Sequence, residues 1–175
     1  MIDKIVAAID YSDHSQSVFE SAITMARTHK ALLMLLHVVA EGQPIFQLLP
    51  SYSYYPMENS HDYGLNQQKL QYFERAGIDF LQTKAKEAEA AGVAAEFTQL
   101  AGNPGRSICD LANTWSADLV LVGSRGLNGL KEIFLGSVSN YVTHHAHCPV
   151  MVIRPEPDYK SEEVAGLHEL KPLES

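Results

Sequence analysis

The sequence is poor in cysteine, in basic residues and in long apolar runs, and each shortage excludes a class of protein. With 2 cysteines in 175 residues, the chain is not a small domain held together by disulfides. Its formal charge is −8, from 13 basic and 21 acidic residues, which argues against a broad basic face for nucleic acid. No apolar stretch reaches the roughly 18 residues that a membrane helix requires.

The N-terminal segment lacks the basic region and long apolar stretch of a secretory leader. We therefore expect a cytoplasmic protein with reduced thiols. We expect neither nucleic acid nor a membrane among its partners.

Two widespread phosphate-binding motifs are also missing. The chain has no GxxxxGK[ST] sequence, so no lysine of that type is placed on the terminal phosphates of a nucleotide. The GxGxxG of dinucleotide-binding folds is absent after the first apolar run. No set of side chains clearly activates a water molecule or a nucleophile. The sequence therefore favours a binding protein, with at most weak hydrolysis, over a dedicated enzyme.

Apolar, β-branched runs alternate along the chain with amphipathic stretches. We predict strands at 4–9, 31–39, 93–100, 119–122 and 149–153, and helices at 15–29, 67–91, 104–115 and 137–146. This alternation indicates a parallel sheet with helices on both faces, joined by right-handed crossovers. We therefore predict an α/β fold, a three-layer α/β/α doubly wound sheet of five parallel strands. Ligands of such sheets bind beyond the carboxyl ends of the strands.

Two segments depart from this pattern. Residues 41–66 are rich in proline and tyrosine and form an insertion, which is a lid over a ligand, a partner surface or a disordered loop. Residues 156–175 form an acidic tail, best explained as a solvated appendage. We expect one domain over 1–155, with 41–66 as its variable insertion, followed by this tail.

The strongest functional signal is a pair of glycine-bearing turns. Gly123 and Gly126 follow the fourth predicted strand, and after nine more residues Gly136 and Ser137 begin the last predicted helix. Glycine lets the backbone approach a ligand closely, and the N–H groups of a helix N-terminus favour an anion. The segment therefore predicts a phosphate site. The alternative is a tight strand-to-helix connection that binds nothing.

This spacing resembles the ATP-binding signature of the universal stress protein family. Further matches occur in the same order at 6–10 (Val-Ala-Ala-Ile-Asp), 36–39 (Leu-His-Val-Val), 102–104 (Gly-Asn-Pro) and 147–150 (His-Cys-Pro-Val). The resemblance covers 1–155 apart from most of the insertion. It implies an adenine nucleotide alpha hydrolase-like fold with strand order 3-2-1-4-5. It also implies an adenine-nucleotide-dependent sensor or regulator in the stress response, binding ATP or AMP and forming a homodimer through the last strand, Val150 to Ile153.

The same resemblance implies a role for individual residues. Asp10 would contact the ribose or lie beside it. Val38 would offer backbone groups to the adenine, whose pocket Ala8 and Val122 would line. The phosphates would be surrounded by Gly123, Arg125, Gly126, Gly136, Ser137, Val138 and Ser139.

Several alternatives stay open at this stage. Asp10 could only start a helix, and Ser137 could be a plain N-cap. The protein could be a slow ATPase with Mg²⁺ or Mn²⁺ at the nucleotide phosphates, or a chaperone-like scaffold that captures an unknown protein through 41–66. The sequence does not separate ATP from AMP or a cyclic nucleotide.

The cysteines and the histidines near the end of the last predicted helix are better explained by structural roles than by metal binding. Adjacent helical residues point apart, so His144, His145, His147 and Cys148 are poorly spaced for one metal site. Histidines at a helix C-terminus, where they favour the dipole, explain this cluster better. Cys109 is expected to be a small core residue.

Overall fold

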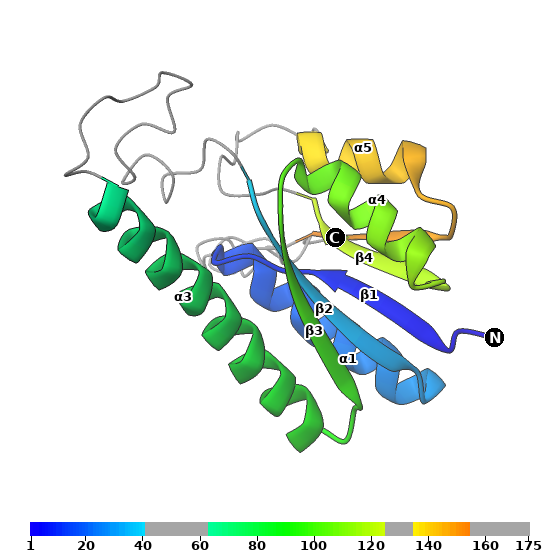
Figure 1. Cartoon of the computed structure of the whole chain (residues 1–175). Coiled ribbons are helices and arrows are strands. Elements are labelled where there is room, and N and C mark those ends of the chain that lie inside the picture. Colours follow the sequence, from blue (N-terminus) through cyan, green and yellow to red (C-terminus); the bar gives the residue numbers. More distant parts are fainter. Residues whose placement is uncertain (41–62, 125–134, 155–175) are drawn as a thin grey trace, which may run out of the picture.

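The computed structural model describes residues 1–40, 63–124 and 135–154, in which strands and helices alternate as predicted (Figure 1). The elements are β1 (Lys4–Ala8), α1 (Asp13–His29), β2 (Leu32–Val39), α3 (Tyr63–Ala90), β3 (Ala95–Ala101), α4 (Pro104–Thr114), β4 (Leu119–Gly123), α5 (Ser137–His145) and β5 (Val150–Ile153). Arg125, Gly126, residues 41–62 of the predicted insertion and the tail 156–175 lie outside the described residues. No helix of the described segments is both long and apolar enough to cross a membrane.

The strands of the described segments form one five-stranded parallel sheet in the order β3-β2-β1-β4-β5. This is the order that the resemblance implied. The central strand β1 pairs with β2 through Ile5 and Leu33 and with β4 through Ile5 and Leu119. Because β1 is covered on both faces, Ile5, Val6 and Ala7 are fully buried.

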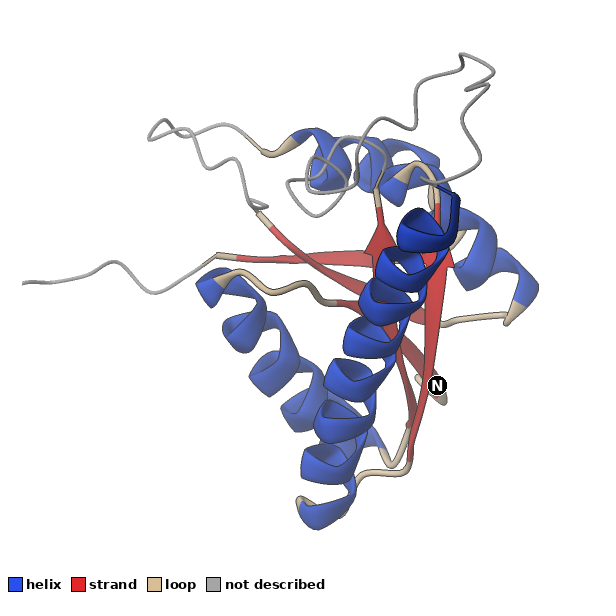
Figure 2. Ribbon diagram, turned by 60° about the vertical axis from the view of Figure 1, so that its left-hand side comes forward, coloured by secondary structure: helices blue, strands red, loops and turns tan. Residues whose placement is uncertain are grey.

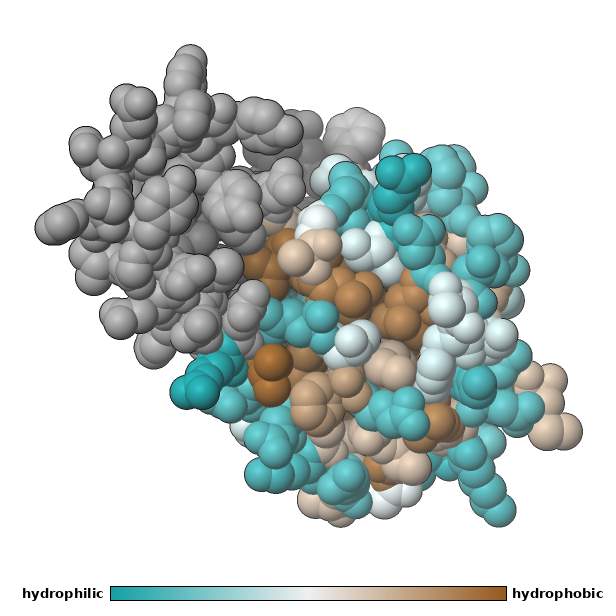
Figure 3. All heavy atoms as spheres, viewed as in Figure 1, coloured by the Kyte–Doolittle hydropathy of each residue, from teal (hydrophilic) through white to brown (hydrophobic). Residues whose placement is uncertain are grey.

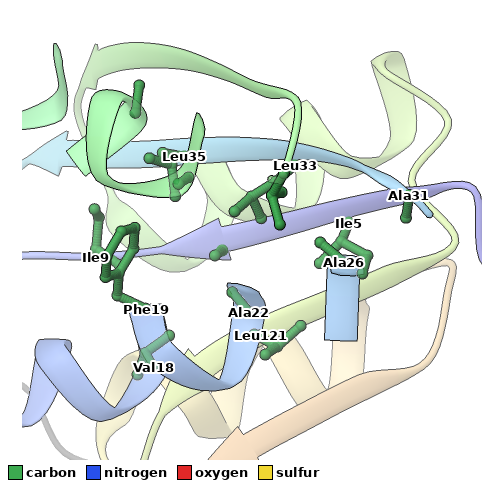
Figure 4. Close-up of a cluster of buried hydrophobic side chains, with 14 of the residues drawn as sticks. Ile5, Ile9, Val18, Phe19, Ala22, Ala26, Ala31, Leu33, Leu35 and Leu121 are labelled. Carbon is green, nitrogen blue, oxygen red and sulfur yellow. The ribbon is translucent and has the colours of Figure 1, made fainter. Parts of the chain in front are cut away.

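Helices cover both faces of the sheet, which confirms the three-layer architecture (Figure 2). On one face, Ile5 and Leu35 of the sheet pack against Phe19 of α1 and Leu81 of α3. Figure 4 shows side chains from β1, β2 and α1 meeting in this core. The opposite face packs against α4 and α5, from residues such as Val6, Leu36, Val120, Ile108 and Val142. Successive side chains on a strand point to opposite faces, so each strand supplies both cores.

The boundaries of α3 and β3 differ from the sequence prediction. Helix α3 begins at Tyr63, so the last residues of the expected insertion, 63–66, are helical. No proline follows Pro56 in this region, and the helical hydrogen bonds can therefore extend upstream of the amphipathic stretch. Gly92 ends the helix with a φ of 80°, as expected of a C-terminal glycine. The N–H of Val93 then donates to Ala88 O at 3.0 Å, which keeps Val93 in the turn rather than in β3.

Strands β3 and β5 lie at the two edges of the described sheet. Near the β3 edge, the large apolar side chains of Phe97 and of Ile78 on α3 are exposed. Figure 3 shows this side of the molecule, where apolar surface lies between hydrophilic margins. At the other edge, every residue of β5 is partly exposed.

Candidate functional site

In the strand order β3-β2-β1-β4-β5, the chain adds β2 and β3 on one side of β1 and then crosses over to add β4 and β5 on the other side. The carboxyl ends of β1, β2 and β4 lie at this switch point. Here the connection after β1 runs to α1 on one face, and the connection after β4 runs to α5 on the other. The strand registers pair Ala8 with Leu36 and Ala7 with Leu121, and Asp10, Val38 and Ser124 each follow these pairs by two or three residues. A doubly wound sheet binds its ligands at such a switch point.

Asp10 organises the turn that follows β1. Its backbone N–H donates to Ser15 Oγ at 2.8 Å, and its Oδ1 accepts from the backbone N–H of Ser12 at 2.9 Å and from the Ser12 hydroxyl. Aspartate in such a turn fixes the backbone just before a helix. Among the described residues, the bonds to this carboxylate all use Oδ1, so Oδ2 takes no part in holding the turn.

The two halves of the glycine motif lie against each other. The carbonyl oxygen of Ser124 accepts from the N–H of Gly136 at 2.7 Å and from Ser139 Oγ at 3.4 Å. On its other side, the N–H of Ser124 donates to Ile153 O at 2.8 Å. One peptide segment therefore connects the end of β4, the start of α5 and the edge strand β5.

Gly136, not Ser137, is the N-cap of α5, which corrects the alternative that Ser137 caps this helix. The carbonyl of Gly136 accepts the N–H of Asn140 at 2.9 Å as the first helical hydrogen bond, so α5 begins at Ser137 as predicted. Glycine has no side chain to cap the helix, and the described residues provide no other side-chain cap. The first N–H groups of a helix have no acceptor within the helix and carry partial positive charge. This end of α5 can therefore receive an anion.

The hydroxyl groups of the two serines in α5 differ in position. Ser137 is exposed, whereas Ser139 is buried and donates its hydroxyl to Gly136 O at 3.0 Å. The Ser139 side chain is thus used inside the protein. Val138 between them packs partly into the core beside α4.

Nine of the residues named from the sequence are in the described part of the chain, and the fold gathers them at the carboxyl ends of the strands. They are Ala8, Asp10, Val38, Val122, Gly123, Gly136, Ser137, Val138 and Ser139. Val38 and Val122 are buried, while Ala8 and Gly123 are partly exposed.

Sequence reasoning missed an aromatic group beside Asp10. His37 on β2 is buried, and its ring centroid lies 5.1 Å from that of Tyr11 and 6.2 Å from that of Phe80 on α3. The rings of Tyr11 and Phe80 are 4.8 Å apart. The available signal was a single titratable residue within the apolar run 32–39, which by itself does not separate a site residue from a core residue.

Burial favours the uncharged forms of His37 and Tyr11 in this group. It lowers the pKa of His37, although the carbonyl of Ile9 and the carboxylate of Asp10 act in the opposite direction. Burial also raises the pKa of Tyr11, and the carboxylate of Asp79 raises it further.

Metal-ligating side chains do not gather in the described segments, where no three His, Cys, Asp or Glu residues are placed to hold an ion. His145 instead stacks on Tyr141, with ring centroids 4.0 Å apart, and its Nδ1 lies 2.8 Å from Tyr141 O. Cys109 is buried in the core on the α4 side, as expected.

Comparison with known proteins identifies relatives over nearly the whole chain. A model of the universal stress protein family matches residues 1–154. Universal stress protein Sll1388 of Synechocystis is 34% identical over 154 residues, covering 86% of this chain and 97% of its own. Universal stress protein YxiE of Bacillus subtilis is 35% identical over 154 residues, covering 88% of this chain and 100% of its own.

Solved structures share the fold. The universal stress protein UspA of Lactobacillus plantarum superposes with a TM-score of 0.70 at 25% identity, covering 87% of this chain and 98% of that one. A family protein of Arabidopsis thaliana with AMP bound gives 0.56 at 24% identity, covering 93% and 99%. A universal stress protein in complex with cAMP gives 0.55 at 22% identity, covering 87% and 97%. At these last two identities the likeness shows the fold alone.

Proposed function

Because the chain belongs to the universal stress protein family, we propose that it binds an adenine nucleotide where β1, β2 and β4 end. The observation that carries this proposal is the Ser124 O to Gly136 N–H bond of 2.7 Å. It brings the strand end to a helix N-terminus that has no side-chain cap among the described residues, and such a helix end favours a phosphate group. Binding there would make the protein a nucleotide-dependent sensor or regulator.

The proposed contacts are those that the family resemblance implies, and nine of the residues lie together in the described part of the chain. Val38 would present backbone groups to the adenine, with Ala8 and Val122 lining the base pocket. Asp10 would accept a ribose hydroxyl through Oδ2, since Oδ1 holds the turn. Gly123, Gly136 and the N–H groups of Ser137, Val138 and Ser139 would face the phosphates, together with Arg125 and Gly126.

AMP-bound and cAMP-bound proteins of the same fold are consistent with this ligand class. They leave ATP, AMP and a cyclic nucleotide as alternatives. Any accompanying Mg²⁺ or Mn²⁺ would depend mainly on phosphate oxygens, because the described residues offer no cluster of metal ligands. We therefore propose a binding protein with at most weak hydrolysis.

The proposal extends to organisation and place of action. We propose that residues 1–155 are one functional domain and 156–175 an appended tail. Two copies would pair through β5, which lies at an edge of the described sheet and whose unpaired backbone groups can receive another strand. The thiols of Cys109 and Cys148 are free, in keeping with a cytoplasmic protein.

Calorimetry with ATP, AMP, cAMP and GTP tests the ligand class. Adenine nucleotides should bind more tightly than GTP, and Asp10→Asn should weaken their binding while preserving the turn. Asp118→Asn is the matched control, because Asp118 likewise accepts backbone N–H groups, from Asp3 and Lys4, but at the opposite end of β1. Failure of every adenine nucleotide to bind at millimolar concentration would refute the proposal.

A further inference from the structure

His37 continues the pairing of β1 and β2 beyond the last backbone-paired residues. The ladder ends at Ala8 and Leu36, after which the N–H of Ile9 donates to Leu36 O at 2.9 Å. The carbonyl of Ile9 lies 3.1 Å from His37 Nδ1. A carbonyl oxygen only accepts, so Nδ1 carries the hydrogen, and a side chain provides this last connection between the strands.

The residues joined in this way are neighbours of two proposed nucleotide contacts. Ile9 immediately precedes Asp10, the proposed ribose contact, and His37 immediately precedes Val38, the proposed base contact. The Nδ1–H···O bond therefore joins these two strand ends one step beyond the backbone bond from Ile9 N–H to Leu36 O. A ligand that touches both strand ends requires the distance between them to be correct, since small displacements weaken each polar contact.

The ring of His37 packs against the rings of Tyr11 and Phe80. The Tyr11 ring meets the His37 ring edge to face, with an interplanar angle of 73°, and the ring of Phe80 on α3 meets the His37 ring at 72°. His37 is only 2% exposed, so solvent does not compete for Nδ1. Because Tyr11 follows Asp10 directly, the turn of Asp10 is connected to His37 by ring packing as well as through Ile9.

We propose that His37 is a positioning residue of the nucleotide site, which holds the ribose-contacting and base-contacting strand ends at their binding distance. This inference rests on the proposed function. His37 itself touches no phosphate, ribose or base; it acts through Ile9 and Tyr11.

Two substitutions at His37 separate this role from simple packing. His37→Leu fills the space but removes the donor, whereas His37→Asn restores an N–H donor close to the place of Nδ1. Leu81→Ala is the control, because Leu81 belongs to the same core face and is fully buried but makes no bond to the strand ends. The dissociation constant for AMP and the unfolding midpoint are measured for all four proteins.

We expect His37→Leu to weaken AMP binding by about tenfold or more, and His37→Asn to return it to within about threefold of the wild type. Leu81→Ala should lower the unfolding midpoint at least as much as His37→Leu while leaving AMP affinity nearly unchanged. Equal losses of affinity in His37→Leu and Leu81→Ala, or no rescue by asparagine, would overturn the inference. A wild-type protein that binds no adenine nucleotide would instead overturn the proposed function on which it rests.

Discussion

Gly105 of α4 lies directly against Tyr141 of α5, and an added Cβ would be 2.8 Å from Cδ1 of that ring and 3.0 Å from its Cβ. These Tyr141 atoms belong to the inner part of the side chain and not to its flexible end, and the Tyr141 ring is also stacked on His145. The close approach holds the two helices together and so helps to orient the helix that carries the proposed phosphate contacts.

Gly105→Ala should therefore destabilise the protein, by about 1–3 kcal/mol as is usual for overpacking. Gly77→Ala is the matched control. Its added Cβ would meet the side-chain amide of Gln99, the end of a flexible side chain whose buried Oε1 has no hydrogen bond among the described residues to lose when it shifts. In a helix interior this replacement gains up to about 1 kcal/mol from helix propensity. Urea unfolding of both variants measures the contrast, and equal destabilisation would contradict it.

Replacing Gly136 tests the N-terminus of α5. Gly136→Asp and Gly136→Asn both introduce a capping side chain, which leaves stability unchanged or raises it by a few tenths of a kcal/mol. Only aspartate places a negative charge where a phosphate would bind. We expect ATP affinity to fall by about tenfold or more, about 1.4 kcal/mol, beyond the loss in the asparagine variant. Calorimetry with ATP measures the difference, and equal affinities would argue against phosphate at this helix end.

The two serines of α5 should respond in opposite ways to alanine substitution. Ser139→Ala removes a buried hydroxyl that donates to Gly136 O, at a cost of about 1 kcal/mol in stability, with nucleotide affinity nearly unchanged. Ser137→Ala removes an exposed hydroxyl that would donate to the phosphate beside the Ser137 N–H, so stability should be preserved and affinity reduced. Thermal unfolding and calorimetry on both variants provide the comparison. If Ser139→Ala alone lost affinity, its side chain would be a ligand contact.

Stability should depend on pH through His37. Burial lowers its folded-state pKa below the ordinary value of about 6.5, so between the two values the unfolded chain binds the proton more readily. The stabilisation from neutral His37 is thus present above about pH 6.5 and is lost as the pH falls toward the folded-state pKa. Denaturant midpoints should fall more steeply between about pH 7 and pH 5 in the wild type than in His37→Asn. Parallel curves would show that His37 does not contribute.

The fold was predictable because strands that are buried on both faces of the sheet have a continuous apolar sequence. Strands such as β2, with Leu33 and Leu35 on one face and Leu36 on the other, have to be apolar throughout. The glycine junction could also be located, because a glycine turn and a helix start are local features.

The parts that were missed depend on distant contacts or on individual torsion angles. The bond between His37 and Ile9 joins residues 28 positions apart, and no local pattern marks its geometry. The choice of Gly136 over Ser137 as N-cap follows from extended torsion angles at Gly136, φ −59° and ψ 160°, which spacing does not specify. Helix α3 extends to Tyr63 although a proline-rich and tyrosine-rich composition precedes it.

The strand order also has a consequence for biosynthesis. β1 occupies the centre of the sheet, yet its partner β4 is made much later, and the bond from the Lys4 N–H to Asp118 joins residues 114 positions apart. While the ribosome is still making the intervening chain, one edge of the apolar strand β1 has no β4 to pair with. Contacts between such distant residues are slow to form, because a long loop must close first. The nascent chain therefore exposes one edge of β1, a strand that is buried in the finished sheet, until β4 at residues 119–123 has been synthesised.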